Sequence, residues 1–225
     1  MKSKNISQMQ INSLGLQQPF ISMKNDHKFY YGGNQNWCKS KIMRQSGCGA
    51  IAIANILCQV DKFSKGIYSI SKKEYMELVN KLGRFYLHPI PGLGINGIHL
   101  TIGFNIYCLT HHIKLKGHWG TFPSRIWERV DEMLNKGFPV VMAVGPNKLF
   151  HKQKHRLNLY TKGGDGYEMQ CTCRGHFVTI TNMDKDYVTV SSWGEKYYIS
   201  KKQYEAYLKK YSNCFFTNIF IVDKR

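Results

Sequence analysis

The sequence lacks any long hydrophobic run. Its 225 residues are 43% hydrophobic, yet no stretch approaches the roughly 18 consecutive apolar residues of a membrane-spanning helix. The first eighteen residues are polar and lack the apolar stretch of a signal peptide. Internal repeats and low-complexity segments are also absent. These absences predict a cytoplasmic protein with a single domain, built as one unit or as two lobes that share a cleft.

Acidic residues are scarce. The chain has 14 Asp and Glu against 32 Lys and Arg, which gives a formal net charge of +18. The basic residues are scattered and are mostly lysine, whereas proteins that read nucleic-acid sequence favour the bidentate contacts of arginine. No specific nucleic-acid partner is therefore expected. An attraction to acidic partners or surfaces stays open, and the sequence predicts no oligomeric state.

The cysteines form no disulfide framework. Seven is an odd number, and a chain of this size needs no covalent staples. Cys171, Cys173 and His176 have a C-x-C spacing that differs from the usual zinc motif, and no second ligand pair is close by. We therefore expect no metal and no cofactor.

Hydrophobic periodicity predicts helices first and strands later, which is typical of an α+β fold with two lobes. The expected helices are 48–60, 71–82, 97–109, 124–136 and 201–210, and the expected strands are 139–145, 176–183, 187–192, 196–199 and 214–222. Residues 155–170 read as a polar loop or hairpin. We expect one domain over 1–225, divided into an N-terminal arm (1–40), a helical lobe (41–137) and a β lobe (138–225).

Two distant segments carry the chemistry. Ser46-Gly47-Cys48-Gly49 places a cysteine at the head of an apolar helix, and Gly175-His176 places a histidine at the head of an alternating strand. A helix N-terminus lowers the pKa of a thiol, and a neighbouring imidazole stabilises the thiolate. The pair therefore predicts a nucleophile, Cys48, and an acid–base residue, His176.

The strand after His176 supplies a residue to orient the imidazole. A tight turn at Lys185-Asp186 would place Ser191 opposite Ile180, on the face that His176 shares with alternate residues of its strand. Ser191 is the predicted partner of the imidazole. A slip of one residue in register would substitute Ser192, and Asn182 is a further alternative.

These motifs resemble the papain-like cysteine peptidase superfamily, nearest the bacterial leader-cleaving branch that processes bacteriocins after a double glycine. There a Cys-Gly pair starts the central helix and a Gly-His pair starts a strand. Asn or Asp follows about sixteen positions after the His, and a strand of the type Gly-Lys-Pro-Val lines the cleft. Here the corresponding segments are Cys48-Gly49, Gly175-His176, 191–194 and 137–140. The resemblance covers roughly residues 30–200 and implies a bacterial member with the papain-like two-lobed fold.

The resemblance assigns roles and also shows two departures. It implies an oxyanion-hole glutamine about six residues before the cysteine, where this chain has Ile42. We predict Gln35 instead, because the Gly32-Gly33 turn can set its position. The usual Asn or Asp is replaced by a serine, which carries no charge to support an imidazolium. Trp193 would pack over His176 and exclude water.

The sequence therefore predicts a thiol hydrolase that cleaves peptide or amide bonds in a peptide or protein substrate through a Cys-His acyl-enzyme. Two alternatives remain. A transglutaminase-like or amidase-like acyl transferase would use the same site with another acceptor. A catalytically inactive binding module would keep the scaffold, in line with the missing Asn and the positive charge.

Overall fold

The computed structural model describes residues 14–16, 19–25, 27–67, 69–148 and 154–225. Its helices are η1 (Gln35–Trp37), α1 (Lys41–Ser46), α2 (Cys48–Ser64), α3 (Lys72–Leu82), η2 (Gly83–Leu87), α4 (Gly97–Thr110), η3 (Pro123–Arg125), α5 (Ile126–Asn135) and α6 (Lys201–Tyr211). Its strands are β1 (Leu14–Gly15), β2 (Ser22–Asn25), β3 (Lys28–Tyr31), β4 (Ser69–Ser71), β5 (Leu115–Trp119), β6 (Val140–Val144), β7 (Leu157–Gly163), β8 (Gly166–Cys173), β9 (His176–Met183), β10 (Tyr187–Ser192), β11 (Glu195–Ser200) and β12 (Ile219–Lys224).

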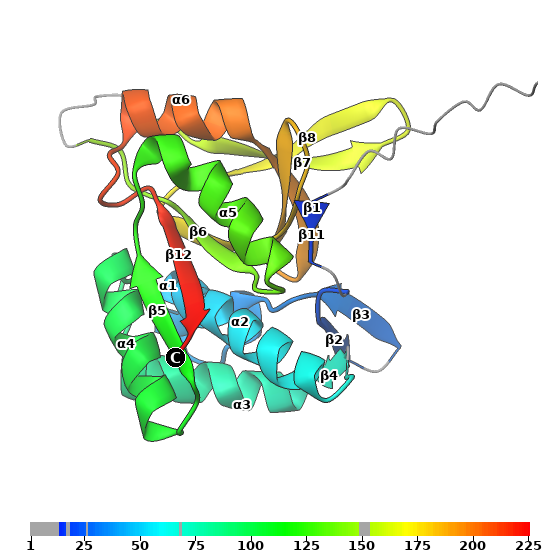
Figure 1. Cartoon of the computed structure of the whole chain (residues 1–225), viewed down its shortest axis with the longest axis vertical. Coiled ribbons are helices and arrows are strands. Elements are labelled where there is room, and N and C mark those ends of the chain that lie inside the picture. Colours follow the sequence, from blue (N-terminus) through cyan, green and yellow to red (C-terminus); the bar gives the residue numbers. More distant parts are fainter. Residues whose placement is uncertain (1–13, 17–18, 26, 68, 149–153) are drawn as a thin grey trace, which may run out of the picture.

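The described strands form two sheets. The larger has the order β5-β12-β6-β9-β10-β11-β7-β8, with β1 added on β9, and the smaller has the order β3-β2-β4. Helices α1 to α4 gather at one end of the molecule, and α5 and α6 lie beside the large sheet at the other (Figure 1). The predicted α+β class is confirmed, and the arrangement is consistent with a two-lobed papain-like fold.

Helix α2 is buried because it is apolar nearly all round. Ile53, Ala54 and Ile56 are fully buried, as the run of apolar residues predicted. The glycines at its start are required by packing. A Cβ at Gly47 would lie 2.4 Å from the Met43 carbonyl oxygen, and one at Gly49 would lie 2.6 Å from Ile95 Cδ1. The two glycines therefore let α1, α2 and the loop before α4 meet closely around the intervening cysteine.

Helix caps fix the neighbouring elements. The Ser71 hydroxyl accepts a hydrogen bond of 3.2 Å from the Glu74 N–H at the start of α3, so the predicted helix start is confirmed. Asn96 caps α4 in the same way, through the His99 N–H at 2.8 Å. The Trp119 ring lies directly against Gly97, where a Cβ would come within 2.0 Å of it. Glycine is thus needed where β5 packs on the start of α4.

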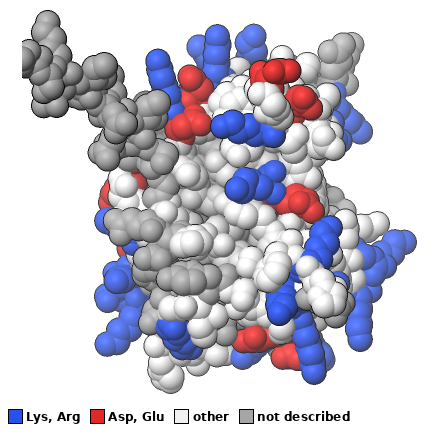
Figure 2. Space-filling model, turned by 90° about the vertical axis from the view of Figure 1, so that its right-hand side faces the viewer, with Lys and Arg blue, Asp and Glu red and all other residues white. Residues whose placement is uncertain are grey.

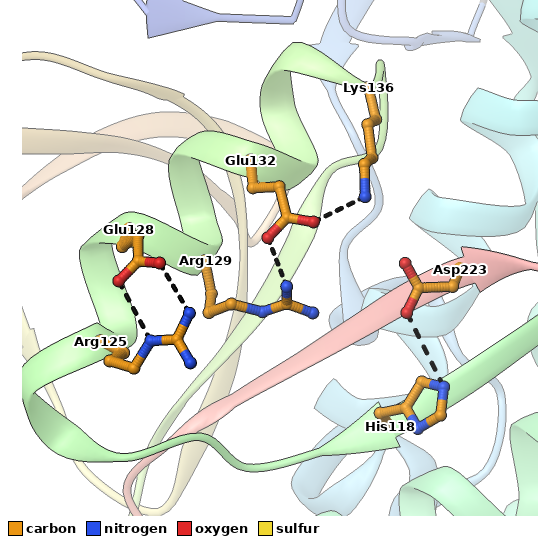
Figure 3. Close-up of polar contacts among 7 residues, drawn as sticks. All are labelled: His118, Arg125, Glu128, Arg129, Glu132, Lys136 and Asp223. Carbon is orange, nitrogen blue, oxygen red and sulfur yellow. Dashed lines mark hydrogen bonds and ion pairs between the residues drawn. The ribbon is translucent and has the colours of Figure 1, made fainter.

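The surface of α5 carries ion pairs (Figure 3). Arg125 pairs with Glu128, and Glu132 pairs with both Arg129 and Lys136, while His118 on β5 lies 3.8 Å from Asp223 on β12. Exposed pairs of this kind contribute little to stability, because water screens them. The buried apolar side of α5 therefore holds it on the sheet.

Some elements lie where the sequence did not place them. Strand β5 and helix α1 were not predicted, and the last strand begins at Ile219 rather than at 214. The lobe boundaries stay predictions. Strand β5 precedes residue 137 yet pairs with β12 in the large sheet, and β2 and β3 of the predicted arm pair with each other and with β4.

Within the described part of the chain, every helix is too short or too polar to cross a bilayer. Basic side chains are spread over the face shown in Figure 2, with few acidic ones between them. They do not gather there into a single patch.

Candidate active site

Cys48 and His176 line one small pocket. Cys48 is the first residue of α2 and is 8% exposed, and His176 is the first residue of β9. Gln35, Ser192 and Trp193 line the same pocket. Its cavity volume of about 10 Å³ leaves room for roughly one water molecule. The structure therefore brings the predicted nucleophile and the predicted base to one confined place, from elements that lie far apart in sequence.

Burial governs the ionisation of Cys48. Removal from water raises the pKa of its thiol, and the backbone N–H groups of Phe177, Gly49 and Cys48 itself oppose that rise. The expected lowering of the pKa at a helix N-terminus is thus outweighed by burial. In this closed pocket the thiol rests protonated.

Burial acts on His176 in the opposite sense. It lowers the pKa of the imidazole from 6.5 to about 4, because the charged form loses its water. The imidazole is therefore neutral near pH 7 and free to accept a proton. The resting pair is a thiol beside a neutral base.

Trp193 covers the imidazole. The two rings are stacked, with centroids 4.5 Å apart and planes 11° from parallel. Trp193 and Gly194 form the two-residue turn between β10 and β11, and both have positive φ, 50° and 78°. Such a turn favours Asn-Gly, and a bulky residue with positive φ costs on the order of 1–3 kcal/mol. The strained tryptophan is held against the His176 ring, as the sequence predicted.

The serine that meets the imidazole is Ser192, and the prediction of Ser191 is corrected. The distance from His176 Nε2 to Ser192 Oγ is 2.8 Å, whereas the Ser191 hydroxyl donates to the Tyr31 carbonyl at 2.7 Å. Ser191 also lines the pocket, but its hydroxyl is directed to another partner.

A bulge in β9 explains the correction. Near the turn the predicted register holds, since Thr189 is opposite Asn182, but Val190 is opposite Ile180, so Thr181 has no partner on β10. Beyond Thr181 the register is therefore shifted by one residue, which brings Ser192 to the face of His176. Ser192 is also the residue sixteen positions after the histidine, the spacing of the family's third residue.

Gln35 reaches the pocket although it lies thirteen residues before Cys48. Its segment is held to the turn after β10, because Tyr31 N–H donates to Gly194 O at 2.8 Å and the Asn34 amide donates to Trp193 O at 2.7 Å. The Gln35 amide donates to Arg44 O at 2.7 Å, which uses one of its two N–H groups. The predicted oxyanion-hole role of Gln35 stays a prediction.

No role was predicted for Asn55, which organises the floor of the site. It lies on α2, accepts from Gly33 N–H at 3.1 Å and from the Tyr75 hydroxyl at 2.8 Å, and donates to Thr179 on β9 at 3.1 Å. The available signal was an amide side chain in the apolar run of α2, where Gln59 is the other buried amide. Asn55 ties the helix of Cys48 both to the strand of His176 and to the segment of Gln35.

The predicted absence of a metal stays a prediction. Among the residues that the structure describes, no three His, Cys, Asp or Glu side chains are arranged to hold a metal ion. Cys173 is buried and Cys171 is partly buried, and both are free thiols.

Comparisons with known proteins add little to this geometry. No family model matches the sequence, and no curated protein matches it. One similar solved structure is described as a "putative C39-like peptidase from Bacillus anthracis". It is 16% identical, with a TM-score of 0.45, over 86% of this chain and 94% of that one. A likeness that weak carries no conclusion about activity, which must rest on the site.

Proposed function

We propose that this protein is a papain-like thiol hydrolase that cleaves a peptide or amide bond. The supporting observation is the arrangement around one imidazole. Nε2 of His176 is bonded to Ser192 and its ring is covered by Trp193, in the pocket that also contains Cys48. With Nε2 engaged, Nδ1 is the nitrogen left to exchange a proton with the thiol.

The proposed reaction begins with proton transfer. His176 accepts the Cys48 proton as the sulfur attacks the carbonyl carbon of the substrate, and the resulting oxyanion is held by the Cys48 backbone N–H and the Gln35 amide. The imidazolium then donates its proton to the leaving amine, and a thioester remains on Cys48. Water, deprotonated by His176, attacks the thioester and releases the acid, which restores the thiol and the neutral imidazole.

Ser192 plays the orienting role with less electrostatic support than a carboxylate would give. Its hydroxyl accepts from the imidazole N–H and fixes the ring, but it carries no charge to stabilise an imidazolium. The proposed enzyme is therefore slower than a relative with Asp at this position.

Turnover of a peptide library tests the proposal. The wild-type chain is incubated with the library under reducing conditions, and new amino termini are compared with those formed by Cys48→Ala. Cys214→Ala, which removes an exposed cysteine, is the matched control. Cleavage by the wild type and by Cys214→Ala but not by Cys48→Ala supports the proposal.

Two other outcomes contradict it. Transfer of the acyl group to added hydroxylamine, with neither chain cleavage nor amide hydrolysis, would identify an acyl transferase. No turnover of either kind, with no preferential alkylation of Cys48, would identify a binding module.

A further inference from the structure

A second pocket lies on the large sheet, close to the first. Its cavity volume is about 460 Å³, within the range of small-molecule sites. It occupies the side of the molecule where β1, β3 and β11 lie in Figure 1, and it shares no lining residue with the pocket of Cys48. Its lining includes the polar and aromatic residues Tyr31, Thr181, Asn182, Thr189, Lys196 and Tyr198.

The β9 bulge builds this pocket. Asn182, Thr189 and Tyr198 are opposite one another on β9, β10 and β11, and Lys196 is two residues from Tyr198 on the same face of β11. Thr181, the unpaired bulge residue, shares a hydrogen bond of 2.6 Å with the Tyr31 hydroxyl. Three strands thus form the floor, and Tyr31 forms a wall.

The floor is polar where a covered sheet is normally apolar. The other face of β9 and β10 carries Val178, Ile180, Val188 and Val190. On the pocket side the Asn182 amide oxygen accepts from Met183 N–H, which leaves the amide NH₂ unused. Among the described residues, neither that NH₂ nor the Thr189 hydroxyl nor the Lys196 ammonium has a hydrogen-bond partner. The pocket therefore presents three free polar groups, each able to donate.

The positive charge of the pocket and the aromatic side chains around it indicate which class of ligand fits. Lys196 is the one charged residue among the described lining residues, and its Nζ lies 5.0 Å from the centre of the Tyr31 ring. The nearest acid in sequence, Glu195, points to the other face by strand alternation and lies 4.0 Å from Lys28. A single cation matches a single negative charge, and donors beside it suit carboxylate oxygens. Phe20, Tyr31 and Tyr198 offer aromatic faces.

We propose that this pocket binds a small molecule with one carboxylate and one aromatic ring. The carboxylate pairs with Lys196 and accepts from Asn182 and Thr189, and the ring packs among the tyrosines. The site is independent of the proposed hydrolase, because no lining residue takes part in the chemistry of Cys48.

Titration with phenylacetate, followed by amide NMR shifts on the full-length chain, tests the proposal. Acetate supplies the charge without the ring, and benzyl alcohol supplies the ring without the charge. We expect saturable shifts at β9, β10 and β11 with a Kd of about 1 mM or tighter, and binding at least about tenfold weaker for both comparison molecules.

Two variants test the residues. Lys196→Met keeps the length of the side chain and should weaken phenylacetate binding at least about tenfold. The matched control is Lys162→Met, at an exposed lysine of β7 outside the pocket, and should bind as the wild type does. Thr189→Val keeps the shape of the floor and should weaken binding about three- to tenfold through loss of one hydrogen bond.

Several results would overturn the proposal. They are the absence of saturable binding, equal binding of acetate or benzyl alcohol, and unchanged affinity in a folded Lys196→Met. None of these results tests the proposed hydrolase, whose activity is measured by peptide cleavage in the wild type and in Cys48→Ala.

Discussion

The two pockets differ in how much space they leave for a ligand. The pocket of Cys48 and His176 has room for about one water molecule and is lined by Trp193. The second pocket, beside the β9 bulge and called here the bulge pocket, has a cavity of about 460 Å³ and is lined by Lys196. Tyr31 contributes to both sites, because its side chain lines the bulge pocket and its carbonyl holds Ser191. One segment thus contributes to both the small pocket of Cys48 and the larger pocket beside the β9 bulge.

Burial sets the ionisation of both groups of the first pocket. Burial raises the pKa of Cys48 and lowers that of His176, so both groups rest uncharged. In the bulge pocket Lys196 is exposed and can be reached by a ligand. Under the proposed function, the bond to be cleaved would lie at the rim of the Cys48 pocket, because a cavity of about 10 Å³ has no room for a substrate.

Loss of Cys48 or His176 should lower the hydrolysis rate more than any other change considered. It would remove the proposed chemistry of the small pocket and leave the bulge pocket intact. Cys48→Ala and His176→Ala are each expected to lower hydrolysis by at least about 10³-fold, because the nucleophile and its base act as a unit. Initial rates on a cleaved peptide measure this, and Cys214→Ala should stay within about twofold of the wild type. A His176→Ala variant with full activity would contradict the assigned roles.

Acidic pH should lower the free energy of unfolding through the buried imidazole of His176. The pKa of His176 is about 4 in the folded chain and near 6.5 when unfolded, so between these values the unfolded state binds more protons. Stability is therefore full above about pH 6.5 and is lost as pH falls toward 4, by at most about 3 kcal/mol.

Urea unfolding at pH 7.5 and 4.5 measures this loss. His176→Gln should lose less stability between the two pH values than the wild type does. Equal losses in the two chains would show that the imidazole is not shielded from water.

The strand that runs between the pockets offers a matched pair of serines. Ser192→Ala removes the acceptor of the imidazole N–H and should lower hydrolysis about tenfold, the value of one hydrogen bond near 1.4 kcal/mol. Ser191→Ala leaves the Tyr31 carbonyl unpaired and should cost about 1–3 kcal/mol of stability with little change in kcat. Rates and unfolding curves for both variants measure the contrast. The reverse pattern would return the orienting role to Ser191.

The smallest effect is expected at the wall of the open pocket. Tyr31→Phe removes the hydroxyl that bonds Thr181 and should cost about 1 kcal/mol of stability. The alkylation rate of Cys48 should stay within about twofold of the wild type, because the Tyr31 main chain is retained. A large fall in that rate would show that the two pockets are not separate.

Local patterns predicted much of the fold. The alternation in 176–183 and 187–192 located β9 and β10 at their observed ends, and Ser71 marked the start of α3. Strand β5 was missed because Lys116, Gly117 and His118 interrupt its apolar pattern, and it is held by pairing with β12 about a hundred residues later. Long-range pairing of this kind leaves no local signal.

The candidate site, like the fold, was predictable where local sequence features determine it. The two glycines beside Cys48 and the Gly-His pair are local features, and both placed their residues in the pocket. Ser192 depends on the bulge at Thr181, which Tyr31 contacts from 150 residues away. The pKa of Cys48 depends on burial by the assembled fold, so the sequence alone suggested the opposite direction.

The most direct test of the central claim is the pH dependence of Cys48 alkylation by iodoacetamide, read by peptide mass spectrometry in the wild type and in His176→Ala. A coupled thiol–imidazole pair becomes reactive once it loses its first proton, which the pKa of His176 sets at about 4. The wild-type rate should rise near pH 4 and stay level past pH 7. In the variant the rate should rise only above about pH 9, where a buried thiol ionises. Two superimposed profiles that both rise only at alkaline pH would contradict a Cys48–His176 catalytic pair.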